Sequence, residues 1–455
     1  MTTHLEGAVV EGRRIVLLGA TGYTGQRVLR ELLARGAQPS LAGRDRARML
    51  AVADRFETDL PVTEVDVTSA TDLSRLLEPS DVVVSTVGPF MQLGTATVTA
   101  AARAGAHYLD STGEGTFVRR VFELDSVATA RGATLVPAFG YDYVPGNLAG
   151  ALALTRAGER ARHVEIGYFV TRSGHGDELL YRSTLRDAYT LTTGGTRQTL
   201  VGAAAEDGFA YRPSRPGAPS GLVDERAAKR VRTFRYADVK RAAMSVPGSE
   251  HLGLPEVFPQ LESVEVGLGW LGRWTRPVQI AATLQAPLVR SAKVRAAARR
   301  LSGQLPGSRR EPDSDGRSPV IAVARDDSGR QLARTVLTGP DPYEMTGSLL
   351  AWGAVYAAAP DAVLRPGAHG PVAAFGLDTL GLGAAEAGVH EVDEASAAVG
   401  DRLHGYRSRH RDAETGGGGS HRCWVDEQVV RSGASRPLTG SRPPQRKGTV
   451  HGRAG

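Results

Sequence analysis

The 455-residue sequence contains a single cysteine, Cys423, and no long uninterrupted apolar run. One thiol excludes an intramolecular disulfide, a cysteine zinc site and a CxxC redox pair, so reduction chemistry needs a bound cofactor. No apolar stretch approaches the roughly 20 residues that a membrane-spanning helix requires. The first residues, MTTHLEGAVVEGRR, lack the basic and apolar regions of a signal peptide, which predicts a cytoplasmic protein. The histidines are scattered without ligand spacing, so we expect no metal site.

The net charge of +6 comes from one end of the chain. From Arg402 onward there are 11 basic and 4 acidic residues, which leaves 44 basic and 45 acidic residues in 1–401. The body is therefore almost neutral, and nucleic acid is not an expected partner. The stretch 404–455 is rich in Gly and Arg, includes the run GGGGS and has almost no apolar periodicity, which predicts a disordered basic tail.

Residues 14–140 alternate short β-rich runs with helical patterns. The runs RIVLL and DVVVSTV are almost entirely apolar, which is typical of central parallel strands that are buried on both faces. Six strands are expected, at 14–18, 39–42, 62–67, 81–87, 107–111 and 133–139. Strands that alternate with helices predict an α/β fold with a doubly wound parallel sheet of the Rossmann type, which we assign to residues 1–150.

The pattern changes after Gly150. Further strand-like stretches are expected at 163–171, 233–237, 261–267, 278–284, 320–324 and 331–338. They predict a second, α+β domain over 151–340, mainly antiparallel and devoted to substrate. Met345–Ala358 has a helical pattern, and we expect 341–395 to return to the first domain.

The most informative motif is Gly19-Ala-Thr-Gly22-Tyr-Thr-Gly25, which follows the first strand and opens a helix. A helix N-terminus offers free N–H groups to a pyrophosphate, and glycines let the backbone approach it closely. The spacing is GxxGxxG, and its place at the first strand-to-helix turn indicates a dinucleotide site. Additional contacts to phosphate or ribose are expected from Thr21, Tyr23 and Thr24.

The end of the second strand distinguishes NAD from NADP. An acidic residue there binds the ribose 2′-hydroxyl of NAD, whereas an arginine accommodates the 2′-phosphate of NADP. This sequence has Arg44 at that point, followed by Asp45, which we interpret as a helix N-cap. We therefore predict NADP(H) as the cofactor. Asp66, after the third strand, can meet the adenine or cap the following turn.

The fourth strand ends where a Rossmann sheet faces the middle of its cofactor. The residues there are Thr86, Val87, Gly88 and Pro89. We expect them to border the cofactor, although Gly88-Pro89 also fits a simple turn.

Several motifs together resemble one family. GATGYTG, LAGR, VVVSTVGPF, YLDSTGE at 108–114 and AFGYDYVPGN at 138–147 are similar to those of the saccharopine dehydrogenase-like reductases. That family includes the bacterial trans-acting enoyl reductases of lipid biosynthesis. Weaker similarity returns at SVPGSE (245–250), DPY (341–343) and GPVAAFG (370–376). The resemblance implies an NADP-binding domain, an inserted substrate domain, and hydride transfer to a C=N or C=C bond. No residues match the amino-acid clamp of saccharopine-forming enzymes.

Four groups at the ends of the fifth and sixth strands are candidates for proton transfer, because these ends border the nicotinamide cleft. They are Asp110, Glu114, Tyr141 and Asp142. Each carboxyl also has a structural interpretation, as a cap at a helix start or, for Asp142, as a support for the domain crossover. Tyr141 is the preferred proton donor.

The sequence leaves two classes of function open. The first is an NADP-dependent oxidoreductase acting on a small-molecule or lipid-like substrate, such as a lipid or polyketide intermediate. The second is a non-catalytic NADP(H)-binding scaffold or sensor, which the lack of an unambiguous proton donor allows. The basic segment 288–310 is compatible with a peripheral membrane contact or with a solvated helix. The oligomeric state stays open, with a homodimer among the possibilities.

Overall fold

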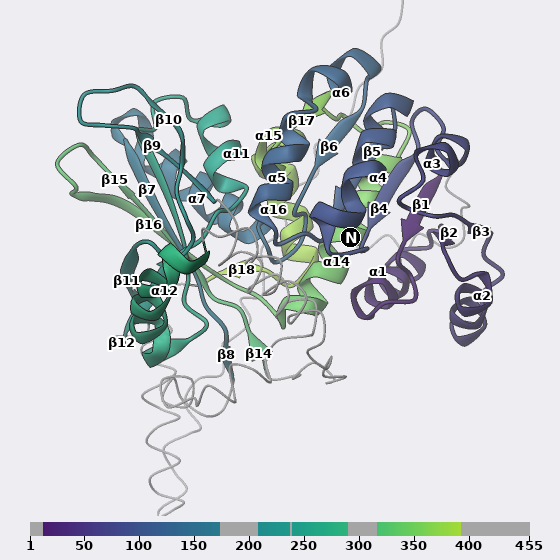
Figure 1. Cartoon of the computed structure of the whole chain (residues 1–455), viewed down its shortest axis with the longest axis horizontal. Helices are drawn as coiled ribbons and strands as arrows, with labels where there is room; N and C mark the ends of the chain where they lie inside the picture. The colour runs from purple at the N-terminus through teal and green to yellow at the C-terminus, as the bar shows by residue number, and fades with distance from the viewer. Residues whose placement is uncertain (1–11, 173–207, 237–238, 290–315, 393–455) are drawn as a thin grey trace, which may run out of the picture. The chain divides into compact units, whose positions relative to one another are not determined.

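A computed structural model describes residues 12–172, 208–236, 239–289 and 316–392 (Figure 1). The predicted basic tail lies outside the described residues. So does the proposed membrane segment 288–310, except for the last helical residues up to Val289. Within the described part of the chain, no helix combines the length and apolarity needed to cross a membrane.

The first sheet has seven described strands, all parallel, in the order β17-β6-β5-β4-β1-β2-β3. Its strands are β1 (Ile15–Leu18), β2 (Ser40–Gly43), β3 (Val62–Glu64), β4 (Val82–Ser85), β5 (His107–Asp110), β6 (Thr134–Val136) and β17 (Gly367–Ala368). This arrangement confirms the predicted doubly wound sheet. The order reverses between β1 and β4, which is where such sheets bind ligands. The strand β17, from the far end of the chain, was not predicted.

Alternating residues of the central strands explain why this sheet is covered on both faces. In β1, Leu17 packs into one hydrophobic core, while Val16 and Leu18 pack into another. Strand β4 behaves in the same way, and its four residues are all buried. The covering helices are α1 (Tyr23–Ala34), α2 (Arg46–Arg55), α3 (Ala70–Leu76), α4 (Phe90–Ala104), α5 (Gly115–Phe122), α6 (Asp125–Arg131) and α14 (Pro342–Ala358).

The second sheet is mixed and mostly antiparallel, which confirms the predicted class of this region. Its strands are β7 (His163–Tyr168), β9 (Phe209–Pro213), β10 (Ser220–Asp224), β11 (Val231–Tyr236), β12 (Val239–Ser245), β13 (Ser263–Leu268), β15 (Val320–Arg325), β16 (Gln331–Thr338) and β18 (His390–Glu391). Only the central pair β7 and β13 is parallel among the described pairings of this sheet. Short strands β8 (Thr171–Arg172) and β14 (Gly316–Arg317) pair beside it.

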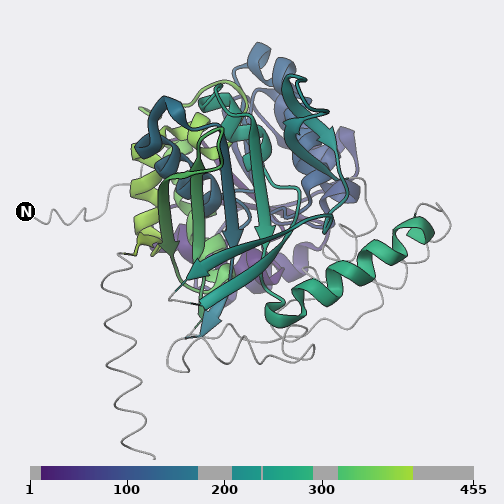
Figure 2. The same cartoon turned by 90° about the vertical axis from the view of Figure 1, so that its left-hand side faces the viewer.

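The expected strand at 278–284 is wrong. These residues lie in α12 (Thr275–Val289), one long helix beside β11 and β12 (Figure 2). Val278, Ile280 and Thr283 are β-branched, which favoured a strand. Ala281 and neighbouring Ala and Gln residues are strong helix formers, and Ile280 is exposed, so no buried strand face exists here.

The chain crosses between the sheets through α7 (Val144–Ala157) and later returns. Helix α14 packs on α1, where Arg27 pairs with Glu344 at 2.8 Å, and β17 adds to β6. The proposed boundary at residue 150 falls inside α7, so the division into domains stays a prediction. The remaining helices are α11 (Glu250–Val257), α15 (Pro371–Phe375) and α16 (Leu377–Glu386), with single 3-10 turns at Gly158–Arg160 and Gly272–Trp274.

Asp81 joins the starts of β1 and β4. Its buried carboxylate accepts hydrogen bonds from Arg14 Nε at 3.0 Å and Nη2 at 2.6 Å, and from the Glu78 N–H at 2.8 Å. We expect Asp81→Ala to lower the free energy of unfolding by about 1–3 kcal/mol, because it leaves these donors unsatisfied. Urea unfolding followed by circular dichroism measures this. Asp54→Ala, at an exposed position of α2, is the control and should change stability by less than about 0.5 kcal/mol. Equal losses in both variants would contradict the assignment.

Candidate functional site

The turn after β1 is shaped for close approach of a ligand. Gly19 has a φ of +89°, a region that favours glycine, and its carbonyl accepts the Gly22 N–H at 2.9 Å. A Cβ at Gly25 would lie 2.0 Å from that carbonyl oxygen. Helix α1 begins at Tyr23, and its N-cap residue Gly22 has no side chain to cap it, so its first N–H groups are left for another acceptor. This geometry suits a pyrophosphate, as the sequence predicts.

The end of β4 lies against this turn. The Thr86 hydroxyl donates to the Leu18 carbonyl at 3.1 Å, and a Cβ on Gly19 would lie 2.5 Å from the Thr86 hydroxyl oxygen. The Val87 side chain is also in contact range of that position. Gly88 is exposed, and Pro89, which follows a cis peptide bond, precedes the first residue of α4. The structure therefore brings Thr86 and Val87 beside the glycine turn.

Three further residues of the turn were predicted to contact the cofactor. Tyr23 packs edge-on against Tyr343 of α14 at 5.2 Å, with Arg27 over its ring, and burial raises the pKa of Tyr23 to about 12. The side chains of Thr21 and Thr24 are half-buried at the turn and make no hydrogen bond within the described part of the chain. Both hydroxyls are therefore available to a ligand. Tyr23 contacts α14, and its contact with the cofactor stays a prediction.

Arg44 directly follows β2 and is exposed. The neighbouring Asp45 caps α2 by accepting the Arg48 N–H at 3.0 Å, so its carboxylate is turned toward its own helix. Asp66 accepts the N–H and hydroxyl of Thr68, and these hydrogen bonds, with a smaller effect of Arg44, lower its pKa. Asp66 therefore caps a turn and lies within electrostatic range of Arg44.

Two of the candidate acids hold neighbouring loops together. Asp110 is fully buried, and one of its oxygens accepts the N–H groups of Thr112 at 2.8 Å and Ala138 at 2.9 Å. Burial raises the pKa of Asp110 to about 7. Glu114 accepts the N–H groups of Phe90 at 2.8 Å and Met91 at 3.0 Å, so it caps the start of α4. Both contacts support the structural interpretation, and their catalytic roles stay predictions.

Tyr141 and Asp142 are adjacent but have different surroundings. The buried Tyr141 hydroxyl donates to the Phe169 carbonyl at 3.2 Å and accepts from the Trp270 indole at 3.1 Å. Burial raises the pKa of Tyr141 far above its usual value. The Asp142 carboxyl is partly accessible and has no hydrogen-bond partner among the described residues, and burial raises its pKa to about 7. Of the pair, Asp142 is the group free to exchange a proton.

A buried acid on the side of the second sheet was not predicted from the sequence. Glu250 opens α11, is fully buried and accepts the Tyr168 hydroxyl at 2.6 Å. The segment SVPGSE was noted for its similarity to the family, but an acid in the first turn of a helix is an ordinary feature and gave no sign of burial. Tyr168 and Trp270 were also not predicted as site residues, because isolated aromatics in a strand or loop usually fill a core.

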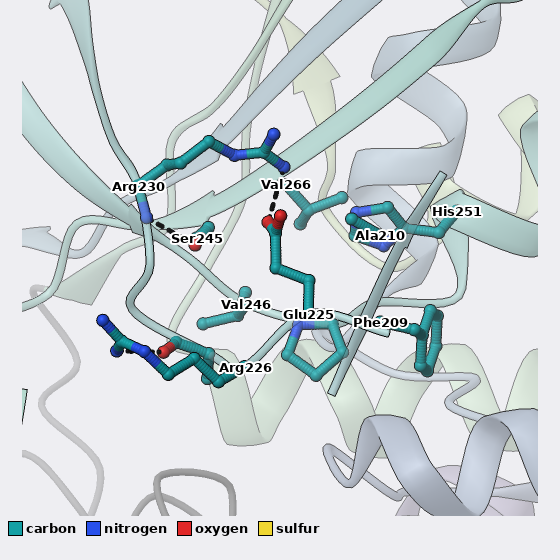
Figure 3. A pocket seen from close by; sticks show the side chains of 11 residues that line it. Phe209, Ala210, Glu225, Arg226, Arg230, Ser245, Val246, His251 and Val266 are labelled. Carbon is teal, nitrogen blue, oxygen red and sulfur yellow. Dashed lines mark hydrogen bonds and ion pairs between the residues drawn. The ribbon is translucent and has the colours of Figure 1, made fainter. Parts of the chain in front are cut away.

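A small pocket lies beside the second sheet, and its lining includes Phe209, Pro247 and His251 (Figure 3). Figure 3 shows the Glu225 carboxylate at its centre, directed toward Arg230. Glu225 pairs with Arg212 at 2.6 Å, Arg230 at 2.7 Å and Lys229 at 3.3 Å, so its charge is neutralised. These ion pairs indicate that Glu225 has a structural role beside the second sheet.

One group of described residues has the spacing of metal ligands. Atoms of His163, Glu262 and Asp327 lie within 4.8 Å of one another, at the end of the second sheet where β7 and β13 begin. The cation Arg162 lies 3.7 Å from Asp327, which disfavours a second positive charge there. The expectation of no metal site stays a prediction.

Gly25→Ala tests the turn. The new methyl group would overlap the Gly19 carbonyl, so the turn must open and NADPH binding should weaken at least about tenfold, the effect of losing one charge-assisted hydrogen bond. Fluorescence titration with NADPH measures the Kd. Gly381→Ala is the matched control, because it is also a helical glycine but has open space around it. Undiminished affinity in Gly25→Ala would show that the cofactor does not use this turn.

Comparison with known proteins supports the interpretation of the glycine turn as part of an NADP site. Residues 15–136 match the family described as the saccharopine dehydrogenase NADP binding domain. Trans-acting enoyl reductases of Mycobacterium ulcerans and Mycobacterium tuberculosis are each 32% identical over 232 residues, which is 45% of this chain and 55% of theirs. The chain thus spans about half the length of these curated relatives.

Two solved structures share the architecture. Saccharopine dehydrogenase (L-Glu forming) of Saccharomyces cerevisiae has a TM-score of 0.51 at 14% identity, covering 81% of this chain and 96% of its own. Homospermidine synthase of Legionella pneumophila, in complex with NAD, has a TM-score of 0.52 at 11% identity, covering 84% and 92%. These likenesses show the fold alone. Residues 15–136 are therefore similar to the saccharopine dehydrogenase NADP binding domain, and the chain shares the fold of these two solved proteins.

Proposed function

We propose that this protein is an NADPH-dependent reductase that transfers hydride to a C=C or C=N bond of a small or lipid-like substrate. The observation that carries the proposal is the uncapped start of α1 behind Gly19, Gly22 and Gly25, with Arg44 at the end of the adjacent strand. NADPH supplies the hydride when it is bound at this edge. The protein then needs a group that gives a proton to the atom opposite the hydride.

The choice of NADPH over NADH rests on charge. Arg44 is an exposed guanidinium that can pair with a 2′-phosphate through two hydrogen bonds. Asp45 would repel a phosphate, but its carboxylate is engaged by the Arg48 N–H. The match of 15–136 to an NADP-binding domain agrees with this assignment.

Asp142 is the proton donor that we favour. It follows β6 at the carboxyl edge of the sheet, where the nicotinamide of a Rossmann domain lies. Thr346 of α14 accepts the N–H of the preceding residue, Tyr141, at 3.0 Å, and α14 also contacts Tyr23 of the glycine turn. The same helix therefore connects the phosphate turn to the Asp142 segment. A carboxyl with a pKa of about 7 is protonated often enough to act as an acid near neutral pH.

The C=C alternative draws support from the relatives, which are named trans-acting enoyl reductases. An enoyl thioester accepts hydride at its β-carbon and a proton at its α-carbon, giving the saturated acyl chain and NADP⁺. Such an intermediate belongs to lipid or polyketide assembly. A C=N acceptor would also need one hydride from NADPH and one proton from the protein.

Arg44→Ala tests the cofactor assignment. Removing the guanidinium should weaken NADPH binding by about 1–3 kcal/mol, or roughly 5- to 150-fold, and leave NADH binding unchanged. Titration of wild type and variant with both nucleotides measures this. The control is Arg75→Ala, at an exposed position near the end of α3, which should change neither affinity. Equal losses for NADPH and NADH would count against a 2′-phosphate contact.

Asp142→Asn tests the reaction. With a 2-enoyl thioester as acceptor, kcat should fall about 10²- to 10⁴-fold while the Kd for NADPH stays the same, because the amide cannot supply the proton. Tyr141→Phe serves as the comparison, and a comparable loss of kcat there would identify Tyr141 as the donor instead. Wild-type protein that binds NADPH but reduces neither enoyl nor imine acceptors would favour the non-catalytic scaffold or sensor.

A further inference from the structure

Helix α12 turns a row of apolar side chains toward solvent. Ile280 and Leu284, about one helical turn apart, are 56% and 74% exposed. Pro277 and Ala281 are also exposed, and they lie at the three- and four-residue spacing that places side chains on one face of a helix. We call these four residues the outer stripe. Single exposed apolar residues are common on proteins, but four on one helix face form a patch that the fold leaves uncovered.

The opposite face of α12 attaches the helix to the second sheet. Thr275 and Gln279 are about one turn apart on this face. The buried Thr275 hydroxyl lies 3.4 Å from the Ala242 carbonyl oxygen of β12, and the Gln279 side-chain amide donates to the Lys229 carbonyl at 3.4 Å. Figure 2 shows α12 extending outward beside β11 and β12. The contacts with the sheet therefore leave the outer stripe on the side that faces solvent.

The charges beside the outer stripe are positive. Arg273 and Arg276, at the start of the helix, are exposed, and neither forms an ion pair with an acid of the described ranges. Between Glu265 and Glu311 the sequence contains nine arginine and lysine residues and no acid. Apolar side chains next to unpaired cations complement a surface that is negative outside and apolar beneath. An anionic lipid membrane has both properties.

We propose that the outer stripe of α12 docks on an anionic lipid membrane. Ile280 and Leu284 enter the boundary between headgroups and acyl chains, while Arg273 and Arg276 contact lipid phosphates. The half-buried Trp274, between the two arginines, suits the level of the headgroups because its ring is amphipathic. The helix has 15 residues, so it lies along the surface and does not cross the bilayer. This inference does not depend on the proposed reductase function.

Two other occupants of the outer stripe fit the structure less well. In a two-fold contact between copies of this chain through this face, Arg273 and Arg276 would meet their own counterparts, and like charges repel. A stable contact with an acidic protein buries roughly 800 Å² on each partner, which is more than four side chains provide. A membrane needs no matching surface, because its lipids adapt to the helix.

Ile280→Gln combined with Leu284→Gln tests the stripe, because glutamine is also a good helix former. Co-sedimentation of the full chain uses vesicles of phosphatidylcholine with about 30% phosphatidylglycerol at low salt. Wild type should bind, and the double variant should bind at least about tenfold more weakly, since two apolar side chains no longer enter the lipid. Arg273→Gln and Arg276→Gln should each weaken binding about fivefold, and only to anionic vesicles. Added salt should release wild type.

Val363→Gln combined with Leu382→Gln is the matched control, because these residues are 79% and 68% exposed and lie outside α12. This control should bind vesicles as wild type does. Undiminished binding in the α12 double variant would overturn the proposal, because another part of the chain would then hold the lipid. Wild type that binds polyglutamate but no vesicles would assign the face to an acidic protein. A dimer that the α12 double variant converts to a monomer would assign it to a second copy.

A fluorescent label reports the contact directly. In a Cys423→Ser background, which removes the single native thiol, Leu284→Cys carries an environment-sensitive dye on the stripe and Leu382→Cys carries it on α16. Anionic vesicles should shift the emission of the first label to shorter wavelength and leave the second unchanged. Equal shifts at both positions, or none on the stripe, contradict docking through α12. If the stripe label responds in a protein without reductase activity, the proposed function fails and the docking stands.

Discussion

Helix α14 covers one face of the parallel sheet, although it comes more than 300 residues after the first strand in the sequence. The rest of the structure depends on this contact between α14 and the sheet. Helix α14 packs across β1, β4, β5 and α1. Gly347 makes the approach possible, since a Cβ there would lie 2.9 Å from Arg27. Without α14, the apolar residues of one face would remain in water, and the sheet would lose a large part of its core.

The same packing assembles the candidate site. The start of α14 places Tyr343 on Tyr23 of the glycine turn and Thr346 on the backbone of Tyr141. The two ends of a bound dinucleotide would therefore be held by loops that share one helical support. Glu114 and Asp110 add to this rigidity by fixing the start of α4 and the exit of β6. Fixed loops at this edge would keep a bound cofactor and the proposed proton donor in register.

Local chemistry explains what the sequence could predict. Almost entirely apolar runs such as Val82–Ser85 indicate central strands. The prediction that Asp45 caps a helix is confirmed, because capping needs only a neighbouring N–H. The strand prediction at 278–284 is wrong, because the β-branched residues of this stretch favour a strand less than its alanines favour a helix. Glu250 could not be found, because its burial depends on Tyr168, which lies 82 residues away in sequence. Distant partners determine burial, and a single sequence does not show them.

The short strand β17 has a consequence for how the protein is made. It closes the edge of the parallel sheet beside β6, and it comes from residues 367–368, after α14. During synthesis, the first 150 residues leave the ribosome with one sheet face uncovered and one strand edge unpaired. Such surfaces are prone to aggregation until they are covered. The nascent dinucleotide-binding region therefore has to be shielded while roughly 200 further residues are translated, at about 5–20 residues per second, which is a delay of ten seconds or more.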